Sequence, residues 1–383
     1  MNLPWKKIHW LNSTFLIGTF LTTLIAVPVY IWHFGLDAFQ IGLFVFLAAS
    51  TGLSITLGYH RLFSHLTFQA RWPVKAFTLF FGAAAFEGSA LGWCADHRRH
   101  HKFTDHDDDP YDITKGFFHA HIGWLLFRMG PETPLTWVRD LQKDRLAVWQ
   151  HAHYVPLAIA AGFGFPTLLG FLWGGWTSAL GAFLIAGVAR IVFVHHMTFC
   201  INSLCHWIGS QPYSSKCSAR DSMIMAFFTF GEGYHNFHHE FQYDYRNGVK
   251  PWHFDPTKWA IWILHKAGLV AKLRTVPEEI ILKAQIAERQ RRLTETLSSR
   301  QMALSESLHA ILQNAQEKMH AALAHWEQLL AEYRAAAERR GEISRQHRRA
   351  LKRRVREATA SLRAAVKEWT GAHDLIYSAL QAA

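Results

Sequence analysis

Cysteine is scarce in this sequence, and the motifs of common redox cofactors are missing. Of 383 residues only four are cysteine, and none forms a C-x-x-C pair: Cys94, Cys200, Cys205 and Cys217. No H-P-G-G heme motif and no G-x-G-x-x-G nucleotide loop occurs. These absences exclude a C-x-x-C iron site, a heme domain of that type and a dinucleotide-binding loop. We expect reduced thiols and assign them no role.

Residues 277 to 383 have no sustained apolar run and are rich in Ala, Glu, Gln and Arg. Residues 1 to about 275, in contrast, alternate long apolar runs with polar, histidine-rich stretches. The division predicts a membrane-embedded domain over residues 1–275 and a charged helical tail, of coiled-coil or amphipathic type, over residues 276–383.

Four runs are long enough to cross a bilayer, which takes about 20 apolar residues: 12–32, 38–58, 154–173 and 176–199. A fifth run, 74–93, is broken by Gly82, Glu87 and Gly88, and we expect it at the membrane interface. The first run could also be a signal peptide core, but it is too long and lacks a small-residue cleavage site. We predict an all-α membrane protein with four transmembrane helices, a cytosolic histidine-rich helical cap and a C-terminal helical tail.

Positive charge predicts the orientation. The links "HFGLDAF" and "GG" between the paired runs carry no Lys or Arg, whereas the amino terminus and the central loop carry many. The positive-inside rule then places both termini and residues 60–153 in the cytosol.

Histidine is abundant, and eight of the 25 histidines form three tight clusters. "GYHRLFSH" contributes His60 and His65, "DHRRHHKF" contributes His97, His100 and His101, and "GEGYHNFHHEF" contributes His235, His238 and His239. On a helix, positions i, i+3 and i+4 lie on one face, so each trio could converge on a single point. Neutral imidazole is the commonest metal ligand among side chains; the alternative is a polar patch that binds nothing.

The predicted topology brings the clusters together, because an even number of crossings separates every pair of them. All three lie on the cytosolic face. Eight ligands indicate two metals and argue against a structural zinc site, which four ligands close. A ferritin-type centre needs two Glu-x-x-His motifs. Glu232 to His235 and Glu317 to His320 fit that spacing, but the second pair lies in the charged tail.

The motifs "HRLFSH", "HRRHHKFTD", "DPYD", "HIGWLL", "NSLCH", "GEGYHNFHHEF" and "DYRN" resemble those of the membrane fatty acid desaturases, in the Δ9 acyl-CoA (stearoyl-CoA desaturase-like) branch. The resemblance covers residues 10 to 275. It implies two irons held by nine histidines, with Asn202 holding an iron-bound water. The implied ligands are His60, His65, His97, His100, His101, His206, His235, His238 and His239.

The resemblance also implies a reaction: oxygen-dependent insertion of a cis double bond at the Δ9 position of a saturated acyl chain that is carried as acyl-CoA. O2 is then the co-substrate. Because the chain has no redox motif of its own, we expect a separate electron donor, such as a small cytochrome, ferredoxin or rubredoxin with its reductase.

Two other functions remain open. A membrane hydroxylase or alkane monooxygenase has similar clusters, although the N-S-x-x-H motif and Ser64 favour desaturation. The other is a metal transporter or metal-storage protein. A transporter should place its ligands near mid-membrane, whereas these clusters flank the spans. The net charge of +11 suits membrane lipid or an acidic partner and does not by itself imply nucleic acid.

Several charged or polar neighbours of the clusters have weaker assignments. We expect His195 and His196 to pack or to hydrogen-bond ligand histidines. Asp107, Asp108 and Asp109 are either a solvated run or acceptors for ligand histidines. We expect Arg98 and Arg99 to pair with acidic groups or with the substrate head group.

The acyl chain should run between the spans and end at the second one. The positions 12 and 8 residues before His60 are Ala48 and Gly52, both small, and Phe44 lies one turn deeper. We predict that these three residues form the tunnel end. The alternative is that Ala48 only permits close helix packing.

The tail has helical apolar spacing, which we expect Gly341 and Gly371 to interrupt. The run "RQHRRALKRR" suits lipid or an acidic donor; a solvated helix is the alternative. The spaced residues are Leu297, Leu304, Ile311, Met319, Leu323, Trp326, Leu330 and Tyr333.

Overall fold

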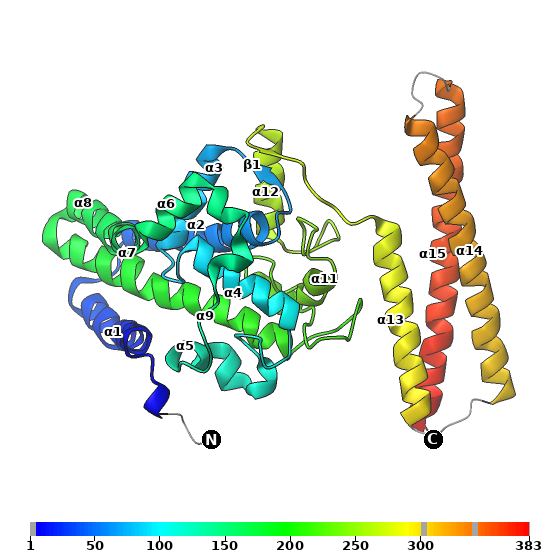
Figure 1. The fold of residues 1–383 in the computed structure, drawn as a ribbon, viewed down its shortest axis with the longest axis horizontal. Coiled ribbons are helices and arrows are strands. Elements are labelled where there is room, and N and C mark those ends of the chain that lie inside the picture. Colours follow the sequence, from blue (N-terminus) through cyan, green and yellow to red (C-terminus); the bar gives the residue numbers. More distant parts are fainter. Residues whose placement is uncertain (1–4, 300–304, 339–343, 383) are drawn as a thin grey trace. The chain divides into compact units, whose positions relative to one another are not determined.

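The computed structural model describes residues 5–299, 305–338 and 344–382, which are mainly helical (Figure 1). Two compact units result, Met1–Gln285 and Ile286–Ala383. Two-residue strands β1 (Gln69–Ala70) and β2 (Val270–Ala271) pair antiparallel in the first unit. That residues 1–275 function as a domain separate from 276–383 stays a prediction.

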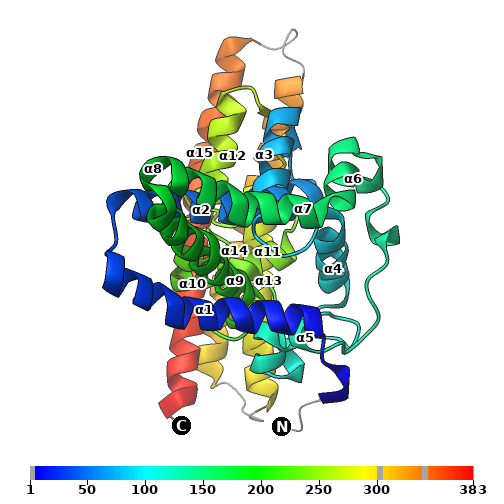
Figure 2. The same ribbon diagram turned by 90° about the vertical axis from the view of Figure 1, so that its left-hand side faces the viewer.

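Within the described residues, three helical segments are long and apolar enough to cross a membrane: Trp10–Phe34, Ala38–Ser64 and Tyr154–His206. The first is α1 (Trp10–Phe34), and the second joins α2 (Ala38–Leu53) to the π-helical η2 (Ser54–Ser64). The third contains α7 (Tyr154–Ile159), η7 (Ala160–Gly164), α8 (Phe165–Ala182), η8 (Phe183–Ala189), α9 (Arg190–Asn202) and η9 (Leu204–His206). Figures 1 and 2 show α1 and α2 beside this long segment.

The long third segment breaks at the predicted "GG" link. Gly174 and Gly175 leave helical geometry, and Gly175 has a φ of 68°, which favours glycine. A Cβ on Gly170 would lie 2.6 Å from the backbone oxygen of Ser178, so the chain folds back on itself at this point. The prediction of four crossings is consistent with this turn, and the count itself stays a prediction.

The run at 74–93 is also broken. Helix α3 (Trp72–Ala83) ends before a turn in which Phe86 has a φ of 59°, and α4 (Ala90–Phe103) follows. Arg190, fully buried, donates to the carbonyl oxygens of Ala84 at 2.6 Å and Gly162 at 3.2 Å, and His195 Nε2 lies 2.8 Å from the oxygen of Ala85. These side chains satisfy the carbonyl groups of Ala84 and Ala85, which follow the end of α3, and Arg190 also connects this turn to Gly162 of η7.

The rest of the first unit is built from short helices around η2 and α4. They are η1 (Trp5–Lys7), η3 (Ile113–Lys115), η4 (His119–Gly123), α5 (Trp124–Leu126), η5 (Leu135–Val138), η6 (Leu141–Lys143), α6 (Arg145–Ala152), α10 (Met223–Phe228), α11 (His235–Glu240) and α12 (Pro256–Lys266). Its largest apolar core joins η2 and α4 through side chains such as Tyr59, Leu62, Leu91 and Ala95, with Ile261 from α12. This packing fixes the elements that carry the histidines.

The tail is helical as predicted, with α13 (Glu278–Ser299), α14 (Glu306–Glu338) and α15 (Arg345–Ala382). Helices α14 and α15 pack along their length, with Met319 and Trp326 buried (Figure 1). The prediction that Gly371 interrupts the tail is wrong, because α15 continues through it. Glycine costs a helix only about 1 kcal/mol, and the buried Trp369 and Ile376 hold this stretch in place. Gly341 and Leu304 lie outside the described residues.

Truncation tests the role of the tail, and the structure decides where to cut. Ile281 in α13 packs against Phe237, between two of the cluster histidines in sequence. We expect a chain ending at Gln285 to keep its full metal content, because all nine candidate ligands and Ile281 remain. A chain ending at Pro277 should bind the same metal but unfold at a lower temperature. Metal analysis measures the metal content of the two truncated chains, and thermal unfolding in detergent measures their stability. Loss of metal from either truncated chain would contradict the prediction.

Candidate metal centre

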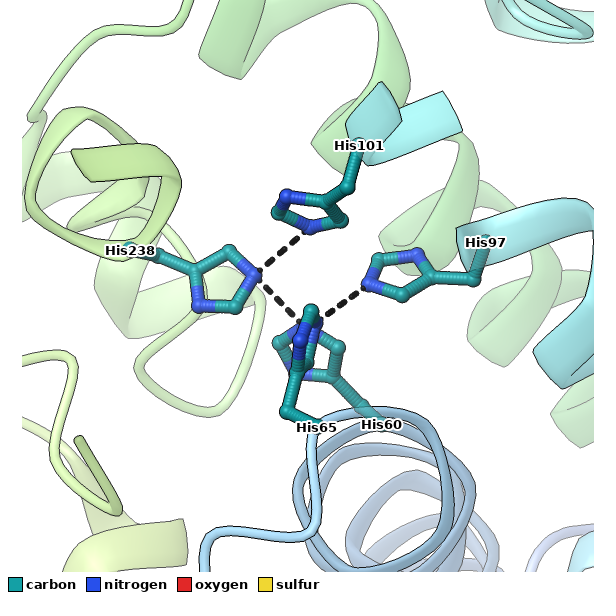
Figure 3. Close-up of side chains that lie close together, drawn as sticks. All are labelled: His60, His65, His97, His101 and His238. Carbon is teal, nitrogen blue, oxygen red and sulfur yellow. Dashed lines mark hydrogen bonds between the residues drawn. The ribbon is translucent and has the colours of Figure 1, made fainter. Parts of the chain in front are cut away.

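Five histidines from three separated segments meet in the first group: His60, His65, His97, His101 and His238. His60 comes from η2, His65 caps it, His97 and His101 come from α4, and His238 comes from α11. Their ligand nitrogens all lie within 4.8 Å of one another. Figure 3 shows the five rings pointing toward a common centre.

Four more histidines form the second group: His100, His206, His235 and His239. Each trio is therefore divided between the groups rather than converging on one point. On a helix, i and i+4 differ by about 40° whereas i+3 and i+4 differ by about 100°. In α4 and α11 alike, the i and i+4 histidines share a group and the i+3 histidine joins the other.

The π-helix explains why His60 and His65 share the first group. The backbone nitrogen of His65 bonds to the oxygen of His60 at 3.1 Å, an i to i+5 bond that widens the turn. In an α-helix, residues five apart would point about 140° away from each other. The wider turn brings the two rings to 4.8 Å between centroids.

Acidic and hydroxyl groups approach the outer nitrogens of three histidines. His60 Nδ1 lies 2.9 Å from Glu232 Oε2, and His100 Nδ1 lies 2.8 Å from Asp109 Oδ1. His206 Nδ1 lies 2.7 Å from Ser218 Oγ, which donates to Asp105 at 2.5 Å. These acceptors favour a proton on Nδ1 and leave the Nε2 lone pair free for a metal.

The Nε2 atoms face one another at distances that require a cation or shared protons. His238 Nε2 lies 2.9 Å from His60 Nε2 and 3.0 Å from His101 Nε2. In the second group, His235 Nε2 lies 3.1 Å from the same atom of both His206 and His239. The buried Nε2 of His100 has no hydrogen-bond partner in the described chain. One cation bound in each group would satisfy the lone pairs of that group.

Burial keeps the imidazoles neutral. It lowers the pKa of His65, His97 and His238 well below 6.5, and the neighbouring imidazoles lower it further. The pKa of His101, His235 and His239 falls for the same two reasons. Neutral rings are the metal-binding form, so the local environment prepares these ligands.

A buried ion network holds the first group. Arg61 donates to Glu232 Oε1 at 2.9 Å and to Asp255 Oδ1 at 3.0 Å, and all three side chains are at most 2% exposed. Burial alone would raise the pKa of Glu232, but Arg61 and His60 outweigh it and lower the pKa to about 2. The ionised carboxylate therefore connects η2 to the loop that precedes α11.

A cavity of about 500 Å³ reaches the first group, and His60, His97 and Asn202 are among its lining residues. Trp93 stacks on His97 with 4.9 Å between ring centroids. Glu87 accepts hydrogen bonds from Trp93 at 3.2 Å and from Thr198 at 2.8 Å. Burial raises the pKa of Glu87 to about 7, although these hydrogen bonds oppose the shift.

Residues 37–262, more than half of the chain, match the family described as "Fatty acid desaturase". This chain belongs to the fatty acid desaturase family. A probable acyl-CoA desaturase of Schizosaccharomyces pombe is 42% identical over 290 residues, which cover 75% of this chain and 59% of the relative. Acyl-CoA desaturase 1 of Saccharomyces cerevisiae is 38% identical over 306 residues, covering 76% and 58%. The chain thus spans less than two thirds of these two relatives.

A human family member has a more similar length. Stearoyl-CoA desaturase of Homo sapiens is 33% identical over 283 residues, which cover 73% of this chain and 76% of the relative. The resemblance predicted from the histidine motifs is therefore confirmed at the level of the family.

The structure shows which charged neighbours of the histidine clusters contact a cluster histidine and which do not. Asp109 contacts a cluster histidine, but Asp107 and Asp108 are exposed, and Asp108 pairs with Arg99 at 3.2 Å. Arg98 pairs with Asp140 at 2.6 Å, as expected for a partner of an acidic group.

His195 and His196 are not members of either histidine group. His195 Nε2 contacts a backbone oxygen and its ring stacks on Phe199, while His196 contacts His121 at 3.1 Å. Glu317 and His320 are exposed on α14 and belong to neither group, so the ferritin-type alternative has no support.

Sequence reasoning does not identify the two groups Glu232 and Ser218, which approach the outer nitrogens of His60 and His206, nor Asp105, which accepts a hydrogen bond from Ser218. Glu232 was noticed only for its spacing to His235, yet its contact is with His60, more than 170 positions earlier. Ser218 lies in a loop without a motif. Asp105, immediately after the second cluster, offered a weak signal of proximity.

Replacement of the Asp109 carboxylate by an amide tests whether its contact with His100 strengthens metal binding in the second group. We expect Asp109→Asn to weaken metal affinity by about 10 to 100-fold, because an amide binds the Nδ1 proton of His100 less strongly than a carboxylate does. Asp108→Asn is the matched control, since Asp108 is exposed and contacts no cluster histidine. Metal retained at graded chelator concentration measures the difference; equal retention in the two variants would contradict the role of Asp109.

Of the three predicted tunnel-end residues, Gly52 lies at a cavity. A second hollow of about 10 Å³ is lined by Gly52 and Phe230, and it shares Ile55 and Thr56 with the large cavity. A Cβ on Gly52 would meet the Phe230 ring at 2.4 Å. Ala48 is buried in α2, and the Phe44 ring packs 5.7 Å from that of Phe193.

Proposed function

We propose that this chain is an oxygen-dependent acyl-CoA desaturase that introduces a cis Δ9 double bond into a saturated acyl chain. The observation that carries the proposal is the meeting of nine histidines in groups of five and four beside a cavity of about 500 Å³. The names of the relatives, acyl-CoA desaturase and stearoyl-CoA desaturase, support the substrate class.

We further propose that each histidine group holds one iron and that Asn202 holds an iron-bound water. The orphan Nε2 of His100 and the facing Nε2 atoms fit two cations, and imidazole sets with open positions suit iron. The irons, once bound, would supply the oxidising chemistry with O2. The ligands would be His60, His65, His97, His101 and His238 for one ion and His100, His206, His235 and His239 for the other.

In this proposal the cavity orients the acyl chain. Phe15, Leu16 and Ile55 give it apolar walls, while Arg99, Lys115 and Arg128 offer cations for the phosphates of an acyl-CoA. The Trp93 indole is held by Glu87 and lies against His97, so the wall beside the metal group is rigid. Such fixed walls decide which C–H bonds face the metal.

The remaining parts of the proposal concern the membrane and the electrons. Four crossings, with the break at Gly174 and Gly175 as the outer turn, would place both termini and both histidine groups in the cytosol. A separate donor, a small cytochrome, ferredoxin or rubredoxin with its reductase, would then reach the centre from that side.

Gas chromatography of lipids from cells expressing the chain tests the proposal. We expect a new cis monounsaturated acid with the double bond at position 9, and none from a His239→Ala variant. A hydroxy acid would instead identify a hydroxylase or alkane monooxygenase. An unchanged profile with metal bound to both groups would favour metal transport or storage and would sink the desaturase proposal.

Substitution of Ala48 tests the proposed tunnel end. We expect Ala48→Trp to cause at least a tenfold loss of activity on stearoyl relative to shorter chains, because the indole would fill space beyond the Gly52 hollow. Val45→Trp is the control, since Val45 is 58% exposed on the same helix. Assays with acyl chains of graded length measure the effect, and an unchanged length profile would place the tunnel elsewhere.

A further inference from the structure

Helices α10 and α12 both turn apolar side chains outward, although both belong to the part of the chain that surrounds the histidine groups. In α10, Met223, Ile224, Phe227 and Phe228 are 51–70% exposed. In α12, the outward stripe is Trp259, Trp262 and Ile263, which at i, i+3 and i+4 share one helix face.

Ring contacts join the two helices into one surface. The Phe254 ring lies 5.1 Å from that of Phe227 and 5.5 Å from that of Trp259. We call the joined surface the aromatic face: Met223, Ile224, Phe227, Phe228, Phe254, Trp259, Trp262 and Ile263. With roughly 100 Å² exposed per side chain it exceeds the few hundred Å² common on soluble proteins.

The aromatic face adjoins two of the candidate spans. Thr229 and Phe230 follow α10 directly, and they line the small hollow together with Gly52 of α2 and Val194 of α9. Gly52 precedes His60 by about two helical turns within its span. The end of α10 therefore packs between two helices that are long and apolar enough to cross a bilayer.

Helix α12 is fixed at a similar level. Its Thr257 Oγ1 lies 2.7 Å from Oγ1 of Thr56, which belongs to the same span as Gly52. Thr257 also donates to the backbone oxygen of Phe230 at 2.9 Å. These bonds connect α12, α10 and the second span in one rigid corner.

Lysines border the aromatic face as they do at membrane surfaces. Lys266 Nζ lies 5.3 Å from the centroid of the Trp262 ring. Just outside the face, Lys250 Nζ lies 5.6 Å from the ring of Trp252, which precedes Phe254 by two residues. Tryptophan prefers the boundary between head groups and acyl chains, where a lysine can lay its alkyl stem on apolar surface and keep its charge in water.

We propose that the aromatic face lies in the membrane, at the head-group boundary of the bilayer that the candidate spans cross. Its occupant is lipid rather than a second protein, because the face continues from two spans and has a lysine border. Helices α10 and α12 are then in-plane membrane helices. The proposal concerns attachment and does not depend on the reaction.

Spin labels on the full-length chain in lipid nanodiscs test this proposal. Single labels are placed at Ile224→Cys and Ile263→Cys in a Cys200→Ser, Cys217→Ser background, since Cys94 and Cys205 are buried. Leu24→Cys on α1, where Leu24 is 56% exposed, is the lipid reference, and Lys143→Cys, at an exposed position of η6, is the water reference. Collisions are measured with O2, which concentrates in lipid, and with a nickel chelate, which stays in water.

We expect the ratio of oxygen to nickel collisions at positions 224 and 263 to be several-fold above that at Lys143 and below that at Leu24, because Leu24 lies near the middle of α1 and the aromatic face lies at the head-group boundary. A ratio equal to that at Lys143 would show a solvent-exposed face and overturn the proposal. Protection from both reagents would show a protein covering, a second copy or another chain, and would overturn it too. Each labelled variant is scored only if its metal content matches that of the unlabelled background.

Discussion

His238→Ala is expected to abolish desaturation, with at least a thousandfold loss of turnover, and to lower the iron content of the purified protein. His238 Nε2 lies within 3.0 Å of the Nε2 atoms of both His60 and His101, so its ring is one of those that surround the centre of the first group. Alanine removes one imidazole and leaves an ion under-coordinated beside the cavity. Iron analysis together with an acyl-CoA assay measures both effects.

His325→Ala is the matched control for this variant. His325 is an exposed histidine on α14 and belongs to neither metal group, so its loss should change neither iron content nor activity. Full activity in His238→Ala would remove His238 from the ligand set. An active protein that carried zinc and no iron would contradict the di-iron proposal as a whole.

Arg61→Met is expected to have the largest effect on folding, destabilising the chain by about 3–5 kcal/mol. The variant would leave Glu232 and Asp255 buried without their shared cation. Glu232 would then be neutral or unpaired, and its contact with His60 would change. Thermal unfolding in detergent, followed by metal analysis of the folded fraction, measures the loss.

Lys75→Met is the control for the Arg61 variant. Lys75 pairs with Asp144, but both side chains reach solvent, at 29% and 18% exposed. An ion pair of this kind contributes about 1 kcal/mol or less. Equal destabilisation by the two variants would show that burial of the Arg61 network has no special importance.

The candidate ligands were predictable because histidine is chemically distinctive and each cluster is local in sequence. His206 was the exception, since only the family resemblance selected it over His195 and His196. Helical spacing accounts for which histidine of each trio separates from the other two, but the membership of the two groups also depends on how α4 and α11 are oriented toward each other, which spacing does not give. The shared orientation of His60 and His65 was also unpredictable, because it depends on a π-helix that no residue pattern in the sequence indicates.

The fold was predictable where apolar runs are long and unpredictable where tertiary contacts override local preference. The helical tail and the break at Gly174 and Gly175 follow from composition and glycine chemistry. Gly371 shows the opposite case, because packing of its neighbours on α15 outweighs the small cost of a glycine in a helix. Glu232 was unpredictable for another reason: its contact with His60 joins two residues that lie far apart along the chain.

Helices α4 and α11 each contribute histidines to both groups, so two bound ions would link the same two helices at two separate points. One ion restrains the position of a helix but leaves it free to rotate about that point, whereas two ions restrain rotation as well. We therefore expect metal binding to fix the relative orientation of α4 and α11 during folding, rather than to follow folding as a separate step. Partial chelation would leave α4 and α11 attached but no longer aligned.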